Sequence, residues 1–424
     1  MKLNLLLAST VSLLILVGIA LGGGSPTQNI SIGVLVDLTG DWSSTGNETA
    51  PALEIAAQDV NSYLKKIGSS KHVVLTSEDS GTDPAKAMRG LQNLSQSGIR
   101  VVIAATTSAE LKAMKDYADD NGIIIIGTTS TAPSLAIPGD NIIRLVPDDT
   151  NQGSAMAQVF KMENLSAIVP ITRGDIWGDD LLKAATKSFE AKGGKILEGV
   201  RYSPGTDFSN EAKVLSSIVK EAKSSYGSDK IGVYMISIDE AASLLALAAR
   251  DPELSSVEWF GCDGMAGLES ISQNRTLAQF AVKTGLVCPI YGALSSYKKS
   301  DDYKHMAGAV MQKTGSEPNA YAITSYDALW AVSESMMLSE SLNSLELKEI
   351  LIHTIDRYSG ITSRLKLNAA GDRKSASYDL VAVKEENGSY SWQCIGNFVR
   401  YADGNDELTW KGQRFMLGVL PDIT

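Results

Sequence analysis

Short apolar runs alternate with longer amphipathic segments through the first part of the chain. Residues 31–37 form an apolar run that is typical of a fully buried parallel strand. The next segment, 47–64, places apolar residues at helical spacing and predicts a helix. A strand at 73–76 follows, and Asp83 with Pro84 opens another helix. This β-α-β-α order predicts an α/β fold, in which helices cover both faces of a doubly wound parallel sheet.

The same alternation starts again after a fifth predicted strand at 141–146, so we expect a second α/β domain of similar size. Its predicted strands are 167–171, 195–202, 231–236, 257–261 and 285–290. Further helices are predicted near 303–313, 320–338 and 345–355. The remaining segments, 359–367, 379–384 and 390–394, are typical of β-hairpins, and an irregular tail is expected after them.

Two apolar strands within the stretch 101–133 each run directly into a cluster of hydroxyl residues. After the first strand, Thr107, Ser108 and Glu110 fit a capping box, in which hydroxyl and carboxylate groups satisfy the first amides of a helix. The start of a helix offers free N–H groups and a positive field, so it suits a carboxylate or a phosphate. Ordinary helix capping is the alternative interpretation of either cluster alone.

Three polar loops follow the first, third and fourth predicted strands, at 42–45, 106–108 and 129–131. In doubly wound sheets, ligands bind outside the carboxyl ends of the strands, at the point where the strand order reverses. In a flavodoxin-like strand order these three loops converge. The pattern therefore predicts one shared ligand site.

The N-terminus carries a hydrophobic targeting pattern. Lys2 precedes an apolar run over 5–21, and small residues follow it. These features fit a secretory signal, although the run is long enough to serve as an uncleaved anchor. Both alternatives place the rest of the chain outside the cytoplasm. Because no cysteine follows the run, a lipid-anchored start is excluded.

Composition narrows the range of functions. The 424-residue chain has a formal net charge of -11 and no basic run, so a nucleic-acid partner is not expected. Of the three cysteines, Cys262 and Cys288 are the candidates for a single bridge, with buried free thiols the favoured state. The histidines are scattered, so neither a metal site nor a cofactor is predicted. No nucleophile is paired with an activating base, and an enzyme is not expected.

Several segments together, in this order and spacing, carry a family resemblance over nearly the whole chain. Three of them are Ala105-Thr-Thr-Ser108, Gly127-Thr-Thr-Ser-Thr131 and Phe260-Gly-Cys-Asp-Gly264, and no single one is decisive. The other matching segments are 32–40, 77–84, 177–178, 321–327 and 360–373. The chain resembles the type I periplasmic solute-binding proteins of ABC importers, in the branched-chain amino-acid (Leu/Ile/Val-binding) group.

This resemblance implies two α/β lobes with the ligand in the cleft between them. The chain is expected to cross between the lobes three times, near Pro147, Tyr291 and Ser359. The expected domains are an N-terminal signal or anchor with linker at 1–29, lobe 1 at 30–147 and 291–358, and lobe 2 at 148–290 and 359–424 with the C-terminal tail.

The resemblance also implies which residues contact the ligand. The carboxylate of an amino acid would meet Ala105, Thr106, Thr107, Ser108 and Thr131, with Thr107 at the key hydroxyl position. The ammonium group would meet Thr129, Thr131 and Asp263, of which Thr129 offers its backbone carbonyl. The side-chain pocket would comprise Trp42, Thr45, Trp177, Ile238 and Tyr321. Ile238 stands where relatives often carry an aromatic residue, so the pocket wall is altered.

The chemistry of an α-amino acid agrees with this arrangement, because its fixed opposite charges need anion donors on one wall and a carboxylate on the other. Each assignment also has a structural alternative. Asp263 precedes Gly264, and Asp-Gly is a common turn dipeptide. Trp177 and Tyr321 are equally compatible with plain core positions.

The resulting functional hypothesis is an extracytoplasmic receptor, expected to be a monomer, that binds an amino acid and delivers it to an ABC permease and its ATPase. The aromatic residues of the predicted pocket favour an apolar or aromatic amino acid. Two alternatives stay open: the ligand-sensing ectodomain of a signalling system, and a binder of amide-like or urea-like molecules. Contact with a membrane is expected only through the N-terminal segment or the permease.

Overall fold

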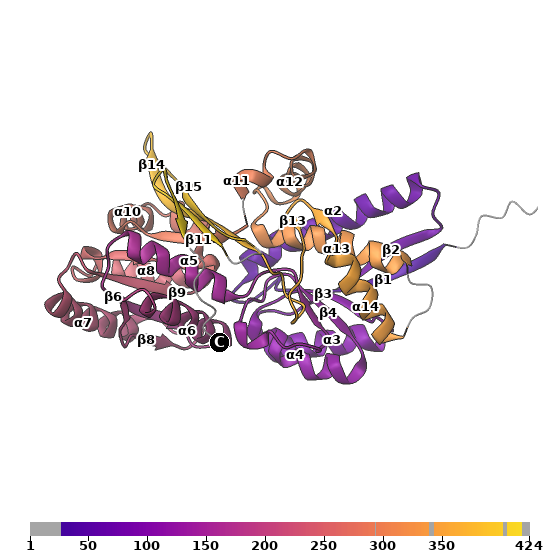
Figure 1. Cartoon of the computed structure of the whole chain (residues 1–424), viewed down its shortest axis with the longest axis horizontal. Coiled ribbons are helices and arrows are strands. Elements are labelled where there is room, and N and C mark those ends of the chain that lie inside the picture. The colour runs from indigo at the N-terminus through magenta and orange to yellow at the C-terminus, as the bar shows by residue number, and fades with distance from the viewer. Residues whose placement is uncertain (1–26, 293, 339–342, 402–404, 418–424) are drawn as a thin grey trace, which may run out of the picture.

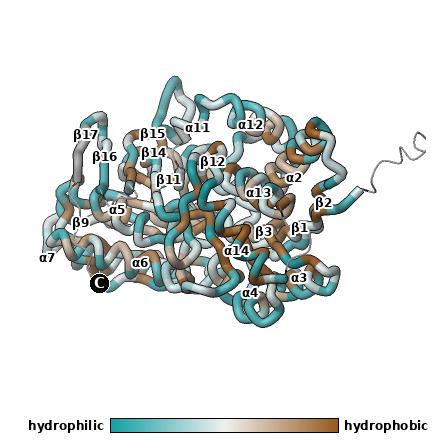
Figure 2. Tube along the Cα trace, turned by 45° about the vertical axis from the view of Figure 1, so that its right-hand side comes forward, coloured by the Kyte–Doolittle hydropathy of each residue, from teal (hydrophilic) through white to brown (hydrophobic). Residues whose placement is uncertain are grey.

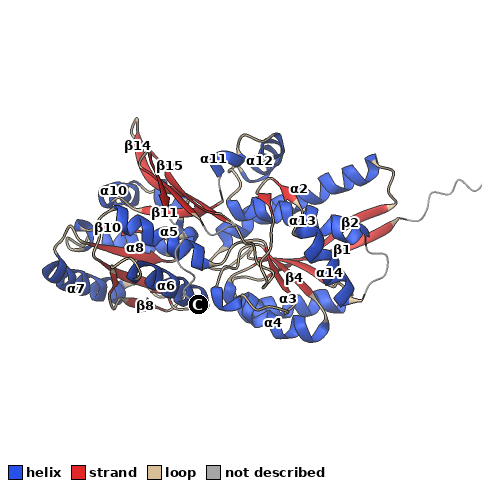
Figure 3. Cartoon of the chain, viewed as in Figure 1, coloured by secondary structure: helices blue, strands red, loops and turns tan. Residues whose placement is uncertain are grey.

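Two β-sheets, each flanked by helices, lie side by side in the computed structural model (Figures 1 and 3). The structure describes residues 27–292, 294–338, 343–401 and 405–417. The predicted N-terminal signal or anchor therefore lies almost entirely outside the described residues, as does the end of the tail. Within the described part of the chain, none of the helices combines the length and the apolar character that a membrane span requires.

The first sheet has five parallel strands in the order β2-β1-β3-β4-β5. This is the flavodoxin-like order that brings the three polar loops together. The strands are β1 (Gln28–Val36), β2 (Lys71–Asp79), β3 (Val101–Ala105), β4 (Ile124–Gly127) and β5 (Ile142–Arg144). The helices around it are α2 (Ser43–Lys66), α3 (Pro84–Gln96), α4 (Ser108–Asn121), α12 (Asp301–Thr314), α13 (Ala320–Leu338) and α14 (Ser344–Ile355).

Along each strand of the first sheet, successive side chains point to opposite faces, so they pack against different helices. In β3, Val101, Ile103 and Ala105 pack into a core shared with α2, α13 and α14. Val102 and Ala104 point to the opposite face, toward α3 and α4. Both faces are thus buried, which explains the continuous apolar runs in the sequence. Figure 2 shows hydrophobic stretches at β3, α13 and α14 in the middle of this half.

The second sheet is larger, and a parallel part continues into an antiparallel part. The parallel strands are β6 (Ala167–Arg173), β7 (Lys195–Ile196), β8 (Val200–Tyr202), β9 (Ile231–Ile236), β10 (Glu258–Phe260) and β11 (Val287–Tyr291). The antiparallel strands are β14 (Ala376–Glu386), β15 (Ser389–Arg400), β16 (Asp406–Trp410) and β17 (Gln413–Leu417). The α-helices around it are α5 (Asp149–Met162), α6 (Ile176–Glu190), α7 (Ser209–Tyr226), α8 (Ala241–Ala248), α9 (Glu269–Ser272) and α10 (Arg275–Thr284).

Short elements complete the described part of the chain. These are the 3-10 turns η1 (Pro133–Leu135), η2 (Leu254–Ser256) and η3 (Asp263–Met265), helix α11 (Leu294–Tyr297), and the strands β12 (Ser359–Gly360) and β13 (Ser363–Arg364). Cys262 and Cys288 are both buried and are free thiols. We call the first sheet with its helices lobe 1, and the second sheet with its helices lobe 2.

The prediction of an irregular tail was wrong, because β16 and β17 extend the second sheet. The signal was present in the sequence of β16: Asp406, Leu408 and Trp410 are buried, whereas the residues between them are not. This alternation is the pattern of a half-buried strand.

The predicted position of the third crossing was also wrong. Ile361, Leu365 and Leu367 lie in the core of lobe 1, and the amide of Arg373 donates to the carbonyl of Arg144 in β5 at 2.9 Å. The chain therefore stays with lobe 1 beyond residue 359 and crosses just before β14. The apolar residues of 361–367 fill space beside the first sheet, which holds the segment there.

The three crossings lie side by side and are bonded to one another. The Tyr291 hydroxyl donates to the carbonyl of Leu145 at 3.4 Å, and the Arg373 guanidinium donates to the Tyr291 oxygen at 2.6 Å. The amide of Gly292 donates to the carbonyl of Ser377 at 2.7 Å. These bonds join all three crossings into one hinge beside the cleft.

Candidate functional site

A small cavity lies between the lobes, at the carboxyl ends of β1, β3 and β4 on one side and of β6, β9 and β10 on the other. Its lining residues are Trp42, Thr107, Ser108, Thr129, Thr131, Arg173, Asp175, Trp177, Ile238, Asp263, Gly264 and Tyr321. We call it the inner cavity. The two lobes thus meet at the position that the doubly wound topology predicts.

The structure brings most of the predicted site residues together around this cavity. The exceptions are Ala105 and Thr106, which are buried behind it, and Thr45, which faces a neighbouring space. Thr106 nevertheless supports the wall, because its carbonyl accepts from the Thr129 hydroxyl at 2.7 Å. Contact of these residues with a ligand stays a prediction.

The wall from lobe 1 is built on the start of α4. The predicted capping box is present: the amide and the hydroxyl of Thr107 donate to Glu110 Oε2 at 2.7 and 2.6 Å. The Ser108 and Ser130 hydroxyls are bonded to each other at 2.9 Å. Since the Thr107 hydroxyl is committed to Glu110, an anion here would be held mainly by the first-turn amides of α4 and by Ser108.

A buried ion pair fastens the second polar loop of this wall. Arg144 and Asp372 form a bidentate pair, with contacts of 2.6 and 2.7 Å, and both side chains are fully buried. Arg144 also donates to the carbonyl of Ala132 at 2.8 Å. The loop carrying Thr129 and Thr131 is therefore held from behind by a charge that does not line the inner cavity. Sequence reasoning missed this pair.

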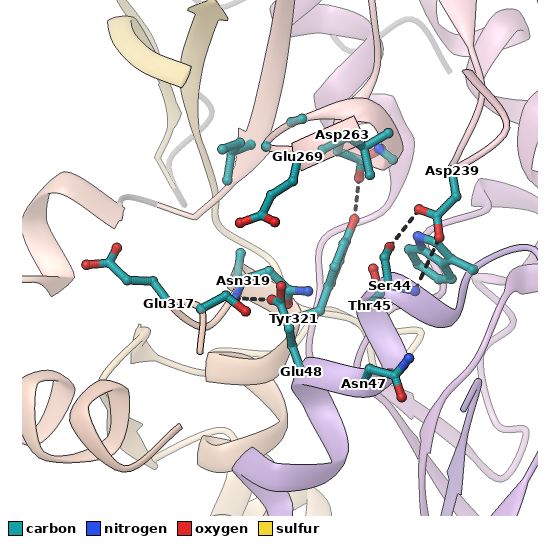
Figure 4. Close-up of a pocket in the computed structure, with 18 of the residues that line it drawn as sticks. Ser44, Thr45, Asn47, Glu48, Asp239, Asp263, Glu269, Glu317, Asn319 and Tyr321 are labelled. Carbon is teal, nitrogen blue, oxygen red and sulfur yellow. Dashed lines mark hydrogen bonds between the residues drawn. The ribbon is translucent and has the colours of Figure 1, made fainter. Parts of the chain in front are cut away.

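A continuous chain of hydrogen bonds runs from this wall to the opposite one. Thr131 donates to Asp149 at 2.7 Å, Gln152 donates to Asp149 at 2.9 Å, and the amide of Asp263 donates to the Gln152 oxygen at 3.0 Å. Tyr321 of lobe 1 then donates to Asp263 at 2.6 Å (Figure 4). The predicted ammonium ligand Asp263 is thus connected to Thr131 through two residues that the sequence did not indicate.

The wall from lobe 2 concentrates negative charge in a buried place. Asp149 is fully buried and Asp263 is 8% exposed. Burial raises the pKa of both carboxyl groups, and the nearby charge of Asp263 raises the pKa of Asp149 further. The pKa values rise because ionised carboxylates lose hydration here without gaining a cation. A ligand ammonium would supply the missing positive charge.

Arg173 is the cationic residue among those that line the inner cavity, and it is already paired. Its guanidinium contacts Asp175 at 2.8 Å, Glu240 at 2.6 Å and, across the cleft, Asp41 at 3.2 Å. Burial lowers the pKa of Arg173, but Glu240 and Asp175 raise it by more. Arg173 and Asp175 could have been identified in the sequence, because Arg173 ends β6 and Asp175 follows it, at the carboxyl end of the strand.

Aromatic residues close the inner cavity. Trp42 and Tyr321 of lobe 1 pack edge to face with ring centres 5.6 Å apart, and both belong to the hydrophobic core of lobe 2. Gly264 leaves space for Ile238 and Trp177, since a Cβ there would lie 2.9 and 3.1 Å from these side chains. The inner cavity has a volume of only about 20 Å³, which is room for about one water molecule.

A larger outer chamber of about 630 Å³ adjoins the inner cavity and shares Trp42, Asp263, Gly264 and Tyr321 with it. Its carboxylates are Glu48, Asp239, Asp263, Glu269 and Glu317 (Figure 4). Among the described residues that line it, none is Lys, Arg or His. Burial, together with neighbouring acids, raises the pKa of Glu48 to about 7.

The chain belongs to the receptor family ligand binding region, whose family model matches residues 48–386. It is 29% identical over 391 residues to an uncharacterized protein of Methanocaldococcus jannaschii, covering 88% of this chain and 90% of that one. It is 23% identical to the Leu/Ile/Val-binding protein BraC3 of Rhizobium johnstonii, covering 83% of this chain and 91% of that one. These matches confirm the resemblance to solute-binding proteins of the Leu/Ile/Val-binding group.

Solved structures confirm the fold. The branched-chain amino acid transporter substrate binding protein LivJ from Streptococcus pneumoniae, in complex with isoleucine, matches with a TM-score of 0.69 and 19% identity, covering 87% of this chain and 99% of that one. A solute binding protein of an ABC transporter from R. palustris, in complex with benzoate, matches with a TM-score of 0.69 and 15% identity. The match covers 87% of this chain and 96% of that one. The fold is that of a type I periplasmic binding protein.

Proposed function

We propose that this protein is an extracytoplasmic receptor of an ABC transporter that captures an amino acid by closure of its lobes and delivers it to a membrane permease. One observation carries the proposal. The start of helix α4 lies on one wall of the inner cavity, and the buried carboxylate of Asp263 lies on the other. Separated donors and acceptors of this kind match the fixed opposite charges of an α-amino acid.

The proposed binding mode follows from the hydrogen bonds of the two walls. The ligand carboxylate meets the first-turn amides of α4 and the hydroxyl of Ser108. Its ammonium group lies against Asp263 and Thr131, with the carboxylate of Asp149 directly behind Thr131. There it replaces the positive charge that the two buried carboxylates lack.

Ligand entry requires the lobes to separate, because the inner cavity holds little more than one water molecule. Trp42 and Tyr321 come from lobe 1 and pack into the core of lobe 2, so they leave that core when the cleft opens. A ligand that touches both walls gains contacts only in the closed form. That difference is what shifts the equilibrium toward closure.

The ligand side chain points toward Trp42, Trp177, Ile238 and Tyr321, which favours an apolar or aromatic amino acid. The outer chamber adds a second selection, because its carboxylates other than Glu317, which pairs with Lys298, repel an anionic side chain. Aspartate and glutamate are therefore expected to bind more weakly than leucine or phenylalanine.

A second ligand class is a carboxylate without an ammonium group, such as the benzoate bound to the R. palustris protein. Such a ligand would satisfy the start of α4 but leave Asp149 and Asp263 without a cation. An amide-like or urea-like ligand would also leave these two carboxylates without a cation. The buried carboxylates therefore favour the amino acid. A ligand-sensing ectodomain would use the same cleft, and a permease and ATPase encoded beside this gene would favour import.

Calorimetry against leucine, isoleucine, phenylalanine, glutamate and benzoate tests the proposal. Asp263→Asn keeps the shape of the side chain and removes its charge, so amino-acid binding should weaken by about 100-fold or more. Asp229→Asn is the matched control, because Asp229 also lies in lobe 2 and its side chain is 81% exposed. Amino-acid binding that is equally strong in both variants would contradict an ammonium site at Asp263.

A further inference from the structure

Helix α2 of lobe 1 lacks a cap from its own lobe. Trp42 occupies the N-cap position without a side-chain hydrogen bond, and the first turn carries no acid. The first amides of a helix need acceptors, and the positive end of the helix favours a carboxylate. Here the acceptor comes from lobe 2. Asp239 accepts from the amide of Ser44 at 3.2 Å and from its hydroxyl at 2.6 Å (Figure 4).

Other helices of lobe 1 contrast with α2 because each is capped by its own N-cap side chain. These caps are Asp83 for α3, Thr107 for α4, Ser300 for α12 and Asn343 for α14. The missing cap is thus found on a helix whose first turn bonds to an acid of lobe 2 across the cleft. A helix capped by the opposite lobe is fully satisfied only while the cleft is closed.

A second contact of the same kind lies elsewhere on the seam between the lobes. Ser134 follows Pro133 in the 3-10 turn η1. The N-cap residue of this turn, Ala132, makes no side-chain hydrogen bond to its amides. Asp180 of α6 accepts from the amide of Ser134 at 2.9 Å. Near it, Ile176 of the same helix packs against the lobe 1 core that includes Ile125. Two acids of lobe 2 therefore satisfy backbone amides of lobe 1 at separate places.

We propose that Asp239 and Asp180 are positioning residues that latch the lobes in the closed state and thereby set ligand affinity and release. Neither residue lines the inner cavity, and Asp239 lines the outer chamber beside it. Because their bonds to lobe 1 exist only when the cleft is closed, they stabilise the closed state without touching the ligand. The proposed effect on closure does not depend on which ligand binds, whereas the proposed effect on ligand affinity rests on the proposed function.

The expected size of the effect follows from helix capping. Removing a capping side chain lowers the corresponding equilibrium constant by about fivefold. Apparent affinity falls with the population of the binding-competent state. In Asp239→Ala and in Asp180→Ala we therefore expect about fivefold faster release, and about 25-fold in the double variant, since the two sites share no partner. The association rate should change little.

Small-angle X-ray scattering of the ligand-free protein tests closure directly. The double variant Asp239→Ala/Asp180→Ala should have a larger radius of gyration than the wild type. Asp116→Ala/Asp229→Ala removes the same charge from two highly exposed acids, one in each lobe, and should scatter like the wild type. Identical scattering curves for all three proteins would overturn the latch. This scattering experiment tests the latch even if no amino acid binds.

Stopped-flow release of leucine separates a latch from a merely structural role. Asp239→Asn keeps an acceptor oxygen without the charge, so its release rate should lie between those of the wild type and Asp239→Ala. Ser44→Ala removes the hydroxyl partner on the other lobe and keeps the backbone amide. Its effect should not add to that of Asp239→Ala if both act through one contact. Fully additive effects, or unchanged release in every variant, would contradict the proposal.

Discussion

The two walls of the cleft are built from different chemistry. The wall from lobe 1 is made of hydroxyls and helix-start amides, and its nearby charges, Glu110 and Arg144, are buried with partners inside that lobe. The wall from lobe 2 carries carboxylates, and burial leaves Asp263 short of a cation. One wall alone can identify an anion and the other alone a cation. Only the closed cleft can recognise a ligand that carries both.

The wall from lobe 1 should depend most strongly on Arg144. Replacing Arg144 by Met leaves Asp372 buried and unpaired, so we expect a loss of about 3–5 kcal/mol in unfolding free energy. Denaturant unfolding measures this loss. Arg201→Met is the matched control, because Arg201 pairs with Asp179 at the surface and such a pair contributes about 0–1 kcal/mol. Equal losses in both variants would show that the buried pair does not hold this wall.

The wall from lobe 2 depends on close packing at Gly264. A Cβ at this position would lie 2.7 Å from the carbonyl oxygen of Ser237 and 2.9 Å from Ile238. We therefore expect Gly264→Ala to cost about 1–3 kcal/mol of stability and to weaken leucine binding. Gly308→Ala in α12 serves as the control, since a Cβ there meets nothing within 4 Å. Unchanged melting temperature and affinity in Gly264→Ala would contradict the close approach.

A buried acid behind the wall of lobe 1 makes stability depend on pH. Asp37 accepts from Ser80 at 2.8 Å and from the amide of Thr82 at 2.6 Å, and burial beside Glu110 raises its pKa to about 9. In the unfolded chain the same carboxyl loses its proton near pH 4. Between these values the folded state holds one more proton, so stability falls as pH rises through this window.

Asp37→Asn should remove this dependence. The asparagine can accept from Ser80 and Thr82 and donate to Glu110, so the fold is satisfied without a shared proton. As the pH rises from about 6 to about 9, the Asp37 carboxyl should lower the unfolding free energy of the wild type by about 1 kcal/mol per pH unit. The unfolding free energy of the variant should fall by correspondingly less. Thermal unfolding across this range measures the slope. Parallel slopes for the two proteins would exclude a proton on Asp37.

The sequence predicted the wall of lobe 1 better than the wall of lobe 2. Thr107, Ser108, Thr129 and Thr131 follow neighbouring strands of one parallel sheet, so topology alone places them together. Asp263 needed the family resemblance, because Asp-Gly by itself indicates only a turn.

Two of the residues missed by the sequence, Arg144 and Asp149, bond to partners that lie outside their own local segment. Arg144 pairs with Asp372, which lies 228 positions along the chain, and Asp149 accepts from Thr131, 18 positions before it. Local patterns contain no information on such pairs. The third crossing was misplaced for the same reason, since the short hairpin of β12 and β13 forms as predicted but the segment 361–367 packs against lobe 1.

Calorimetric titration with leucine and two of its fragments tests the central claim most directly. 4-Methylpentanoate lacks the ammonium group, and 3-methylbutylamine lacks the carboxylate. If the two walls read the two charges together, leucine should bind far more tightly than either fragment, and Asp263→Asn should weaken leucine but not 4-methylpentanoate. If 4-methylpentanoate binds the wild type as tightly as leucine, recognition of a zwitterion by opposed walls is contradicted.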